Sequence, residues 1–222
     1  MQTYRLMWGV VLMVAVVAAW VSVWVPPAFA QKAFVEVTGQ TQCFDTSGNL
    51  IDCSSAAGTG QDGDIQAGVP FPTPRFSDRG NGTVRDNLTN LIWLKNANCS
   101  TISPAVWATA LSNANSLASG QCGLSDRSVA GDWRLPNVKE LQSLIDFGFA
   151  TPALSNAAGT AKWTEGNAFS GVQSGIYWSS TTYADGPVNA WLVHLGDGLT
   201  SGLGVDVRKD HSNLVWPVRG GD

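Results

Sequence analysis

The pattern of apolar and polar positions divides the chain into three parts. Residues 6–25 are almost entirely apolar and follow a single charge at Arg5. Residues 31–74 have little periodic apolar content, too little for a core of their own, and are expected to form a loop-rich arm. From Arg75 onward, short apolar runs alternate with turn residues, so we expect the folded domain over residues 75–222.

Several segments have the composition of strands. Residues 76–86 predict two strands around a glycine-rich turn, and residues 91–94 predict a buried strand that follows another turn. In the arm, residues 43–53 predict a short hairpin with Asp and Asn in its turn, and residues 54–67 are expected to form a loop. Residues 177–219 alternate between apolar and polar positions, separated by Gly and Asp turns, which predicts a C-terminal β meander.

Two helices are predicted between these strand regions. The first would have Ser103 as its N-cap and would end at Gly120. The second would follow Asn137, whose side chain forms a capping box with Glu140, and would end at Gly148. The apolar stripe of the first helix consists of Val106, Trp107, Ala110, Leu111, Ala114 and Leu117. Two helices followed by several strands place the fold in the α+β class.

The first thirty residues have the features of a secretory signal peptide. Pro26-Pro27 ends the apolar run, and the small residues Ala28 and Ala30 predict cleavage after Ala30. The alternative is an uncleaved membrane anchor, because the apolar stretch is nearly long enough to span a bilayer. After cleavage no span remains, so we expect a periplasmic, outer-surface or secreted protein.

Export changes the interpretation of the four cysteines. An even number in an oxidising compartment predicts two disulfides. Of the three possible pairings we favour Cys43–Cys53 and Cys99–Cys122, because each closes a local loop. A zinc site or a nucleophilic thiol is disfavoured, since close pairs of metal ligands are missing and no cysteine is left over.

Composition limits the partners. The chain has 222 residues, only 14% of them charged, and a net charge of −4. One domain with a small appendage is the expected size class. Nucleic acid is an unsuitable partner, because binding to phosphates needs a basic face.

Four distinctive sequence blocks follow one another along residues 75–221. They are Gly80-Asn81-Gly82-Thr83-Val84 with Leu91-Ile92-Trp93, then Asp132-Trp133-Arg134-Leu135-Pro136-Asn137, then Tyr177-Trp178-Ser179-Ser180, and finally Val215-Trp216-Pro217-Val218-Arg219-Gly220. In this order they resemble the Lcl C-terminal domain family, named for a collagen-like surface adhesin. The second and third blocks are also similar to C-type-lectin-like domains of the formylglycine-generating type.

The resemblance implies a C-type-lectin-like architecture, with two helices packed on antiparallel sheets. It also implies an extracellular or envelope module, which in some members is an adhesin for sulfated glycans. This chain has no collagen stalk, so trimerisation through a stalk is not implied, and its acidity argues against a sulfated ligand.

Most motif residues are expected to be structural. Trp133 and Trp178 combine a large apolar body with one N–H donor, which suits a core position. Arg134 is expected to donate to carbonyl groups of a meander strand. The full structural set is Trp133, Arg134, Pro136, Glu140, Trp178, Ser179, Trp216 and Arg219.

The glycine-rich turn raises the question of a metal. Asp78, Asn81 and Asp86 offer oxygens that suit calcium, but their spacing departs from an EF-hand. A hairpin with Asx turns explains the same residues, and we therefore expect no cofactor.

Catalysis has little support in the sequence. A glycosidase needs two carboxylates across a cleft, but no spacing singles out a pair among Glu165, Asp185, Asp197, Asp206 and Asp210. His194 lies in a predicted strand with no nucleophile elbow nearby. The cysteine chemistry of formylglycine-generating enzymes is not carried over, because no cysteine follows Cys122.

Binding is therefore the leading hypothesis. Recognition often lies on loops held by a rigid scaffold, here the loops of the C-terminal meander. Their stacking and hydrogen-bonding groups suit a glycan or a surface protein, and Arg208-Lys209-x-His211 is the basic cluster among them. The candidate ligand residues are Tyr183, Asp185, Asn189, Trp191, Asp197, Arg208, Lys209 and His211. The alternatives are an envelope enzyme that hydrolyses or modifies glycans, and a structural envelope protein without a small ligand.

Overall fold

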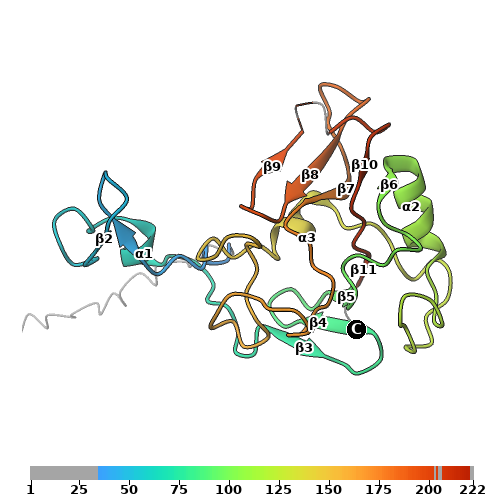
Figure 1. Ribbon diagram of the computed structural model, residues 1–222, viewed down its shortest axis with the longest axis horizontal. Coiled ribbons are helices and arrows are strands. Elements are labelled where there is room, and N and C mark those ends of the chain that lie inside the picture. The colour runs from blue at the N-terminus through green and yellow to red at the C-terminus, as the bar shows by residue number, and fades with distance from the viewer. Residues whose placement is uncertain (1–34, 203, 205–206, 221–222) are drawn as a thin grey trace, which may run out of the picture. The chain divides into compact units, whose positions relative to one another are not determined.

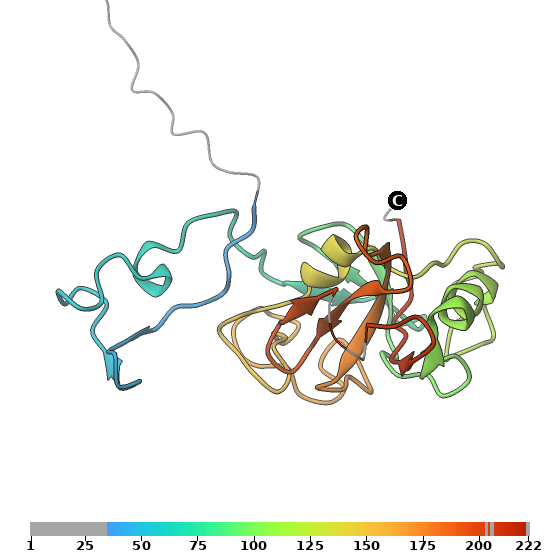
Figure 2. The same cartoon turned by 90° about the horizontal axis from the view of Figure 1, so that it is seen from above.

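The computed structural model describes residues 35–202, 204 and 207–220 (Figures 1 and 2). The signal peptide predicted for residues 1–30 lies outside these residues. The helices are α1 (Asp62–Ile65), α2 (Trp107–Ser116) and α3 (Val138–Gln142). The strands are β1 (Cys43–Phe44), β2 (Leu50–Ile51), β3 (Phe76–Asp78), β4 (Thr83–Asp86), β5 (Ile92–Leu94), β6 (Ala105–Val106), β7 (Ile176–Thr182), β8 (Ala190–His194), β9 (Thr200–Ser201), β10 (Ser212–Asn213) and β11 (Val218–Arg219).

The named strands pair only in the antiparallel sense. They form the sheets β1–β2, β10–β6, β11–β5–β4–β3 and β7–β8–β9. Few short helices with several antiparallel sheets confirm the α+β class. No helix in the described part of the chain combines the length and the apolar character needed to cross a bilayer.

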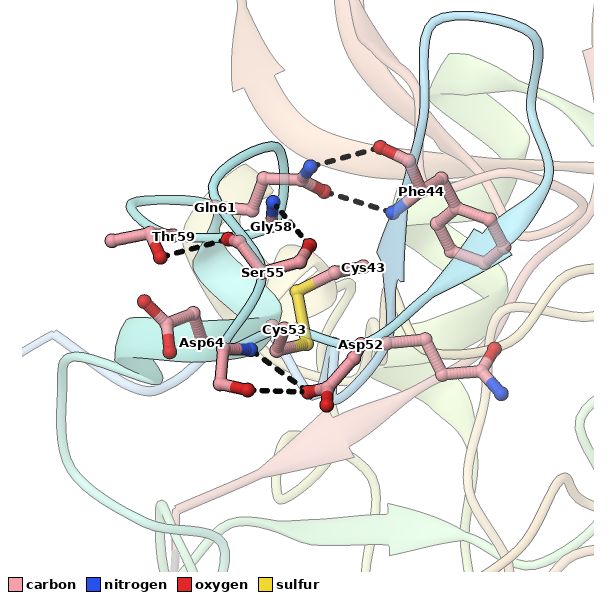
Figure 3. The surroundings of a disulfide bond; sticks show 12 residues. Cys43, Phe44, Asp52, Cys53, Ser55, Gly58, Thr59, Gln61 and Asp64 are labelled. Carbon is pink, nitrogen blue, oxygen red and sulfur yellow. Dashed lines mark hydrogen bonds between the residues drawn. A yellow bond between two sulfur atoms is a disulfide. The ribbon is translucent and has the colours of Figure 1, made fainter.

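The predicted arm hairpin is confirmed (Figure 3). Cys43 is paired with Ile51 across β1 and β2, and the Cys43–Cys53 disulfide joins the two strands just beyond that pair. The Asp45 carboxylate stabilises the turn by accepting hydrogen bonds from the backbone N–H groups of Ser47 and Asn49. The predicted loop after the hairpin contains the helix α1, which is too short to show an apolar period.

Gln61 connects α1 with the hairpin. Its side chain accepts a hydrogen bond from the Phe44 N–H at 3.0 Å and donates one to the Phe44 carbonyl at 2.8 Å (Figure 3). Gln61 therefore satisfies both backbone groups of Phe44, much as a third strand would.

The sheet β7–β8–β9 is covered by apolar residues on both faces, because successive side chains of a strand point to opposite sides. Tyr177 and Val193 face the larger core, which also contains Leu141 of α3. Trp178 and Leu192 face a second, smaller core that includes Ala110 and Ala114 of α2. Trp178 donates its indole N–H to the Ala105 carbonyl at 3.0 Å, which satisfies its one buried donor.

The predicted C-terminal meander is correct only in its first part. β7, β8 and β9 form consecutive antiparallel pairs, but β10 pairs with β6 and β11 pairs with β5. The alternation of apolar and polar residues correctly indicated short strands. It contained no information about which distant strand each one would join.

The first predicted helix begins later than expected. Ser103 is not its N-cap: its buried hydroxyl accepts a hydrogen bond from the Val215 N–H at 3.0 Å. Ala105 and Val106 instead pair with β10, so α2 starts at Trp107, and it ends at Ser116 before reaching Gly120. The pairing with a distant strand overrides the local start signal.

The second helix begins as predicted. The Asn137 side chain accepts from the N–H groups of Lys139 and Glu140, and the Glu140 carboxylate accepts from the Asn137 N–H. The capping box is thus confirmed, although α3 ends at Gln142 and not at Gly148. The residues that follow turn back to contact the arm, where the Phe147 N–H donates to the Thr38 carbonyl at 2.7 Å.

A buried ion pair connects β4 with the residue before β3. Arg75 Nη1 lies 2.9 Å from Asp86 Oδ1, and Arg75 Nη2 donates to the Ser143 carbonyl at 2.6 Å. Burial raises the pKa of Asp86, although the Arg75 charge acts to lower it. Removing either partner would strand an uncompensated charge, so the pair holds these segments in one arrangement.

Candidate functional site

Two of the candidate ligand residues form an aromatic pair at the connection between β7 and β8. The rings of Tyr183 and Trp191 are 5.5 Å apart and meet at 80°, an edge-to-face contact. Both side chains are partly exposed. Gly202 lies against them, since a Cβ atom there would be 2.8 Å from the Tyr183 ring. A larger residue at position 202 would have to displace one of the two rings.

The basic cluster of Arg208, Lys209 and His211 lies on the segment between β9 and β10. Lys209 Nζ is 4.0 Å from the centroid of the Trp107 ring and donates to Thr182 Oγ1 at 2.9 Å. Trp107 is itself held by a hydrogen bond from its indole N–H to the Ser179 carbonyl. Lys209 is therefore a positioned cation on an aromatic face.

Arg208, the first basic residue of the cluster, is more exposed than Lys209. Arg208 forms an ion pair with Asp210 at 2.8 Å. The hydrogen bond with Asp210 raises the pKa of Arg208 and lowers that of Asp210. Each member of such a solvent-exposed pair remains available to an external ligand.

The backbone joins these two groups. Asn189 forms an isolated β-bridge with Arg208 and accepts from the Tyr183 N–H through its carbonyl at 3.1 Å. The side-chain Oδ1 of Asn189 is buried and has no hydrogen-bond partner among the described residues. We call the set Tyr183, Asn189, Trp191, Arg208, Lys209 and Trp107 the loop surface. The exposed residues Asp185 and His211 belong to the same two segments.

Asp197 belongs to a different place. It lies in the turn between β8 and β9, where its carboxylate is 2.7 Å from His194 Nδ1. The hydrogen bond with His194 lowers the pKa of Asp197. The pair lines a cavity of about 330 Å³ whose apolar wall includes Ile176, Leu192 and Val207. The sequence signal for this pair is the spacing of three residues between His194 and Asp197, with Gly196 between them.

The weak calcium candidates have separate partners. Asp78 pairs with Lys95 at 2.6 Å, Asn81 accepts from Thr83, and Asp86 pairs with buried Arg75. Asp78 and Asn81 also accept from nearby backbone N–H groups, as in Asx turns. Within residues 35–202, 204 and 207–220, no three His, Cys, Asp or Glu side chains are grouped so that they could hold a metal ion.

Both predicted disulfides are present, Cys43–Cys53 and Cys99–Cys122. Residues 82–219 match the Lcl C-terminal domain. The chain belongs to the Lcl C-terminal domain family. Comparison with curated proteins and with solved structures gives no significant match. Family membership points to an extracellular or surface-associated module, and the two disulfides are compatible with export.

Within the Lcl C-terminal domain, the four tryptophans of the motif blocks, Trp93, Trp133, Trp178 and Trp216, are fully buried. Trp216 donates its indole N–H to the Leu94 carbonyl at 2.7 Å. The Trp133 indole N–H has no partner in the described part of the chain. Ser179 is also buried, and its hydroxyl donates to the Trp191 carbonyl. This motif residue therefore helps to hold β8, the strand that carries Trp191 of the loop surface.

The two motif arginines have carboxylate partners. The Arg134 guanidinium does not bind meander carbonyls as expected, because it forms two hydrogen bonds with Glu140, at 2.5 and 2.7 Å. The Arg134 backbone instead exchanges hydrogen bonds with Val218 of β11. Arg219 lies 3.4 Å from the buried carboxylate of Asp126. Pro136 accepts from Ser180 through its carbonyl, which links α3 to β7.

Proposed function

We propose that this protein is exported and acts as a surface or envelope binding module that recognises a glycan or a surface protein through the loop surface. The single observation that supports this proposal most strongly is the Tyr183–Trp191 pair, partly exposed and backed by Gly202. Aromatic rings with adjacent polar groups suit ligands that have an apolar face and a hydroxyl rim, and Tyr, Trp and Arg are enriched at binding interfaces. A C-type-lectin-like arrangement of the sheets belongs to the same proposal.

The charges of the loop surface favour a neutral ligand. Arg208 and Lys209 are opposed by Asp185 and Asp210 on the same two segments. A highly sulfated chain needs an excess of cations, which these segments do not supply. We therefore propose a neutral glycan or a protein epitope, and we propose that binding needs neither calcium nor another cofactor.

The test is a glycan array probed with the purified protein in calcium and again in EDTA. We expect saturable binding that is the same in both buffers. The double variant Trp191→Ala, Arg208→Ala should lose it, while Phe147→Ala, which removes an exposed aromatic ring elsewhere, should retain it. Binding that survives the double variant, with circular dichroism confirming its fold, would rule out the loop surface.

The His194–Asp197 pair is the one observation that favours the envelope-enzyme alternative, because a carboxylate that orients an imidazole is a common feature of general-base sites. We propose that the protein is not an enzyme. Chromogenic glycosides provide the test, with Asp197→Asn and Glu165→Gln as variants. Turnover by the wild type that either variant abolishes would favour the enzyme, whereas absence of turnover together with binding on the array supports the module.

A further inference from the structure

A cavity of about 290 Å³ lies away from the loop surface, between the arm and the segment after α3. Its walls include Thr38, Gln66 and Phe71 from the arm and Asp146, Phe149 and Thr160 from the domain. Asp146 is the one ionisable side chain among the residues that line it. A cavity of this size suits a small ligand or a single side chain.

Asp146 has an unsatisfied oxygen. The residue is only 3% exposed, and its Oδ1 accepts a hydrogen bond from the Gly148 N–H at 2.9 Å. Within the described residues no hydrogen bond reaches Oδ2. Gly39 lies directly against the carboxylate, since a Cβ atom there would be 2.0 Å from Oδ1. Oδ2 is not fully enclosed by protein atoms, so a hydrogen-bond donor that enters the cavity can reach it. Such a donor would stabilise the charged form of this largely buried carboxylate.

The buried cation of this region, Arg75, already has other partners. Arg75, 1% exposed, is hydrogen-bonded to Asp86 and to the Ser143 carbonyl. The Arg75 charge acts on two buried carboxylates, Asp86 and Asp146, but the guanidinium is hydrogen-bonded to Asp86 and not to Asp146, so Asp146 has no paired cation among the described residues. Burial raises the pKa of Asp146, while the hydrogen bond from the Gly148 N–H and the Arg75 charge act to lower it.

The aromatic residues of the cavity complement the carboxylate. Phe71 and Phe149 are half-buried, and Phe71 already has the Arg75 guanidinium 4.8 Å from its ring centroid. Aromatic faces attract cations, and such contacts gain strength where water is excluded. We propose that this cavity binds an alkylammonium group, as carried by a lysine side chain or a small primary amine, with the ammonium donating to Asp146. A neutral hydroxyl would satisfy Oδ2 but would leave the charge uncompensated. The proposal is independent of the loop surface.

The first test is titration of the whole protein with n-butylammonium chloride, followed by calorimetry or by chemical shifts of the Asp146 and Gly148 amides. n-Butanol controls for the apolar tail, and sodium chloride controls for ionic strength. We expect saturable binding of the ammonium and at least tenfold weaker binding of the alcohol. Equal binding of both probes, or no binding of n-butylammonium, would overturn the proposal. Nα-acetyl-lysine amide then separates the sources, because tighter binding of this probe indicates a protein lysine and tighter binding of n-butylammonium a free amine.

Variants locate the site. Asp146→Asn can still accept from Gly148 but loses the charge, so we expect affinity for n-butylammonium to fall about tenfold or more. Asp132→Asn, which removes an exposed carboxylate, is the matched control and should leave affinity unchanged. Thr160→Tyr places a bulky ring at an exposed wall of the cavity and should block binding without touching Asp146, which keeps the test decisive if Asp146→Asn folds poorly. Unchanged affinity in a folded Asp146→Asn or Thr160→Tyr would overturn the assignment.

Discussion

The arm hairpin and the Lcl C-terminal domain are stabilised by different means. In the hairpin and the adjoining α1, Cys43 is buried, but Phe44, Leu50 and Ile65 are 38, 62 and 60% exposed. Its shape depends on one disulfide and on polar contacts such as those of Gln61. In the domain, by contrast, large aromatic side chains are completely buried. A short segment without a core relies on a covalent link, whereas a larger one relies on apolar burial.

The aromatic core of the domain is centred on Trp216. Its ring lies 4.9 Å from Phe169 and 5.5 Å from both Trp93 and Tyr177. Trp93 belongs to β5 and Tyr177 to β7, so the same side chain contacts two different sheets. Loss of this ring should therefore weaken both sheets at once.

Trp216→Ala is the change with the largest expected effect. Removing a buried tryptophan deletes its apolar contacts and leaves a cavity, so we expect the free energy of unfolding to fall by about 3–5 kcal/mol. Urea denaturation followed by circular dichroism measures this loss. Trp191→Ala, at a partly exposed position, is the control and should cost far less. A loss below about 1 kcal/mol for Trp216→Ala would contradict the contrast between the two regions.

The two disulfides should differ in where their loss is felt. The Cys43→Ser, Cys53→Ser double variant should lower the free energy of unfolding of the hairpin by about 3 kcal/mol, mainly because the unfolded chain gains conformational entropy when its loop is no longer closed. The effect should stay within the hairpin. Cys99 belongs to the main core, so the Cys99→Ser, Cys122→Ser variant should lower the unfolding midpoint of the whole domain by a similar energy. Amide hydrogen exchange, read separately for residues 43–66 and 75–220, distinguishes the two. A large shift of the domain's midpoint in the first variant would contradict local stabilisation.

The features that the sequence predicted correctly depend on residues close together in the chain. The capping box joins Asn137 to Glu140, and the hairpin turn is stabilised by Asp45 through residues two and four positions away. Both disulfides close local loops. The chemistry of each is visible in a short window, so composition and spacing were sufficient.

The features that were missed depend on distant partners. Ala105 and Val106 form a strand because β10 lies beside them, and this pairing displaces the start of α2. The sequence pattern of β11 likewise does not reveal that it pairs with β5. The alkylammonium cavity combines arm residues with residues more than seventy positions away, and only folding reveals that Asp146 is buried beside them. The loop surface is intermediate. Most of its residues were identified by type, but Trp107 was assigned to the apolar stripe of a helix, and only the structure shows it beside Lys209 and shows Asp197 in a separate turn.

A smaller effect concerns the pH dependence of the domain. Glu140 accepts from both Arg134 Nη atoms and from the Asn137 N–H. Burial acts to raise the pKa of Glu140, but the hydrogen bonds from Arg134 and Asn137 outweigh it, so the pKa is lowered. A carboxyl group whose pKa is lower in the folded state stabilises the fold fully above its unfolded pKa, near 4.3, and loses this contribution as the pH falls through the folded value.

Glu140→Gln should therefore lower the free energy of unfolding by about 1 kcal/mol at pH 7. The difference from the wild type should shrink as the pH falls below about 4, because the wild-type protein loses the same contribution when Glu140 is protonated. Urea denaturation at a series of pH values measures the difference between the two proteins. Arg134→Lys keeps the positive charge but cannot form the bidentate pair with Glu140, so its loss of stability should be intermediate. A difference between wild type and Glu140→Gln that stays constant from pH 7 to pH 3 would show that the glutamate acts through packing alone. In that case the cap of α3 would depend on shape rather than on charge, and the contrast with the polar contacts of the hairpin would become sharper.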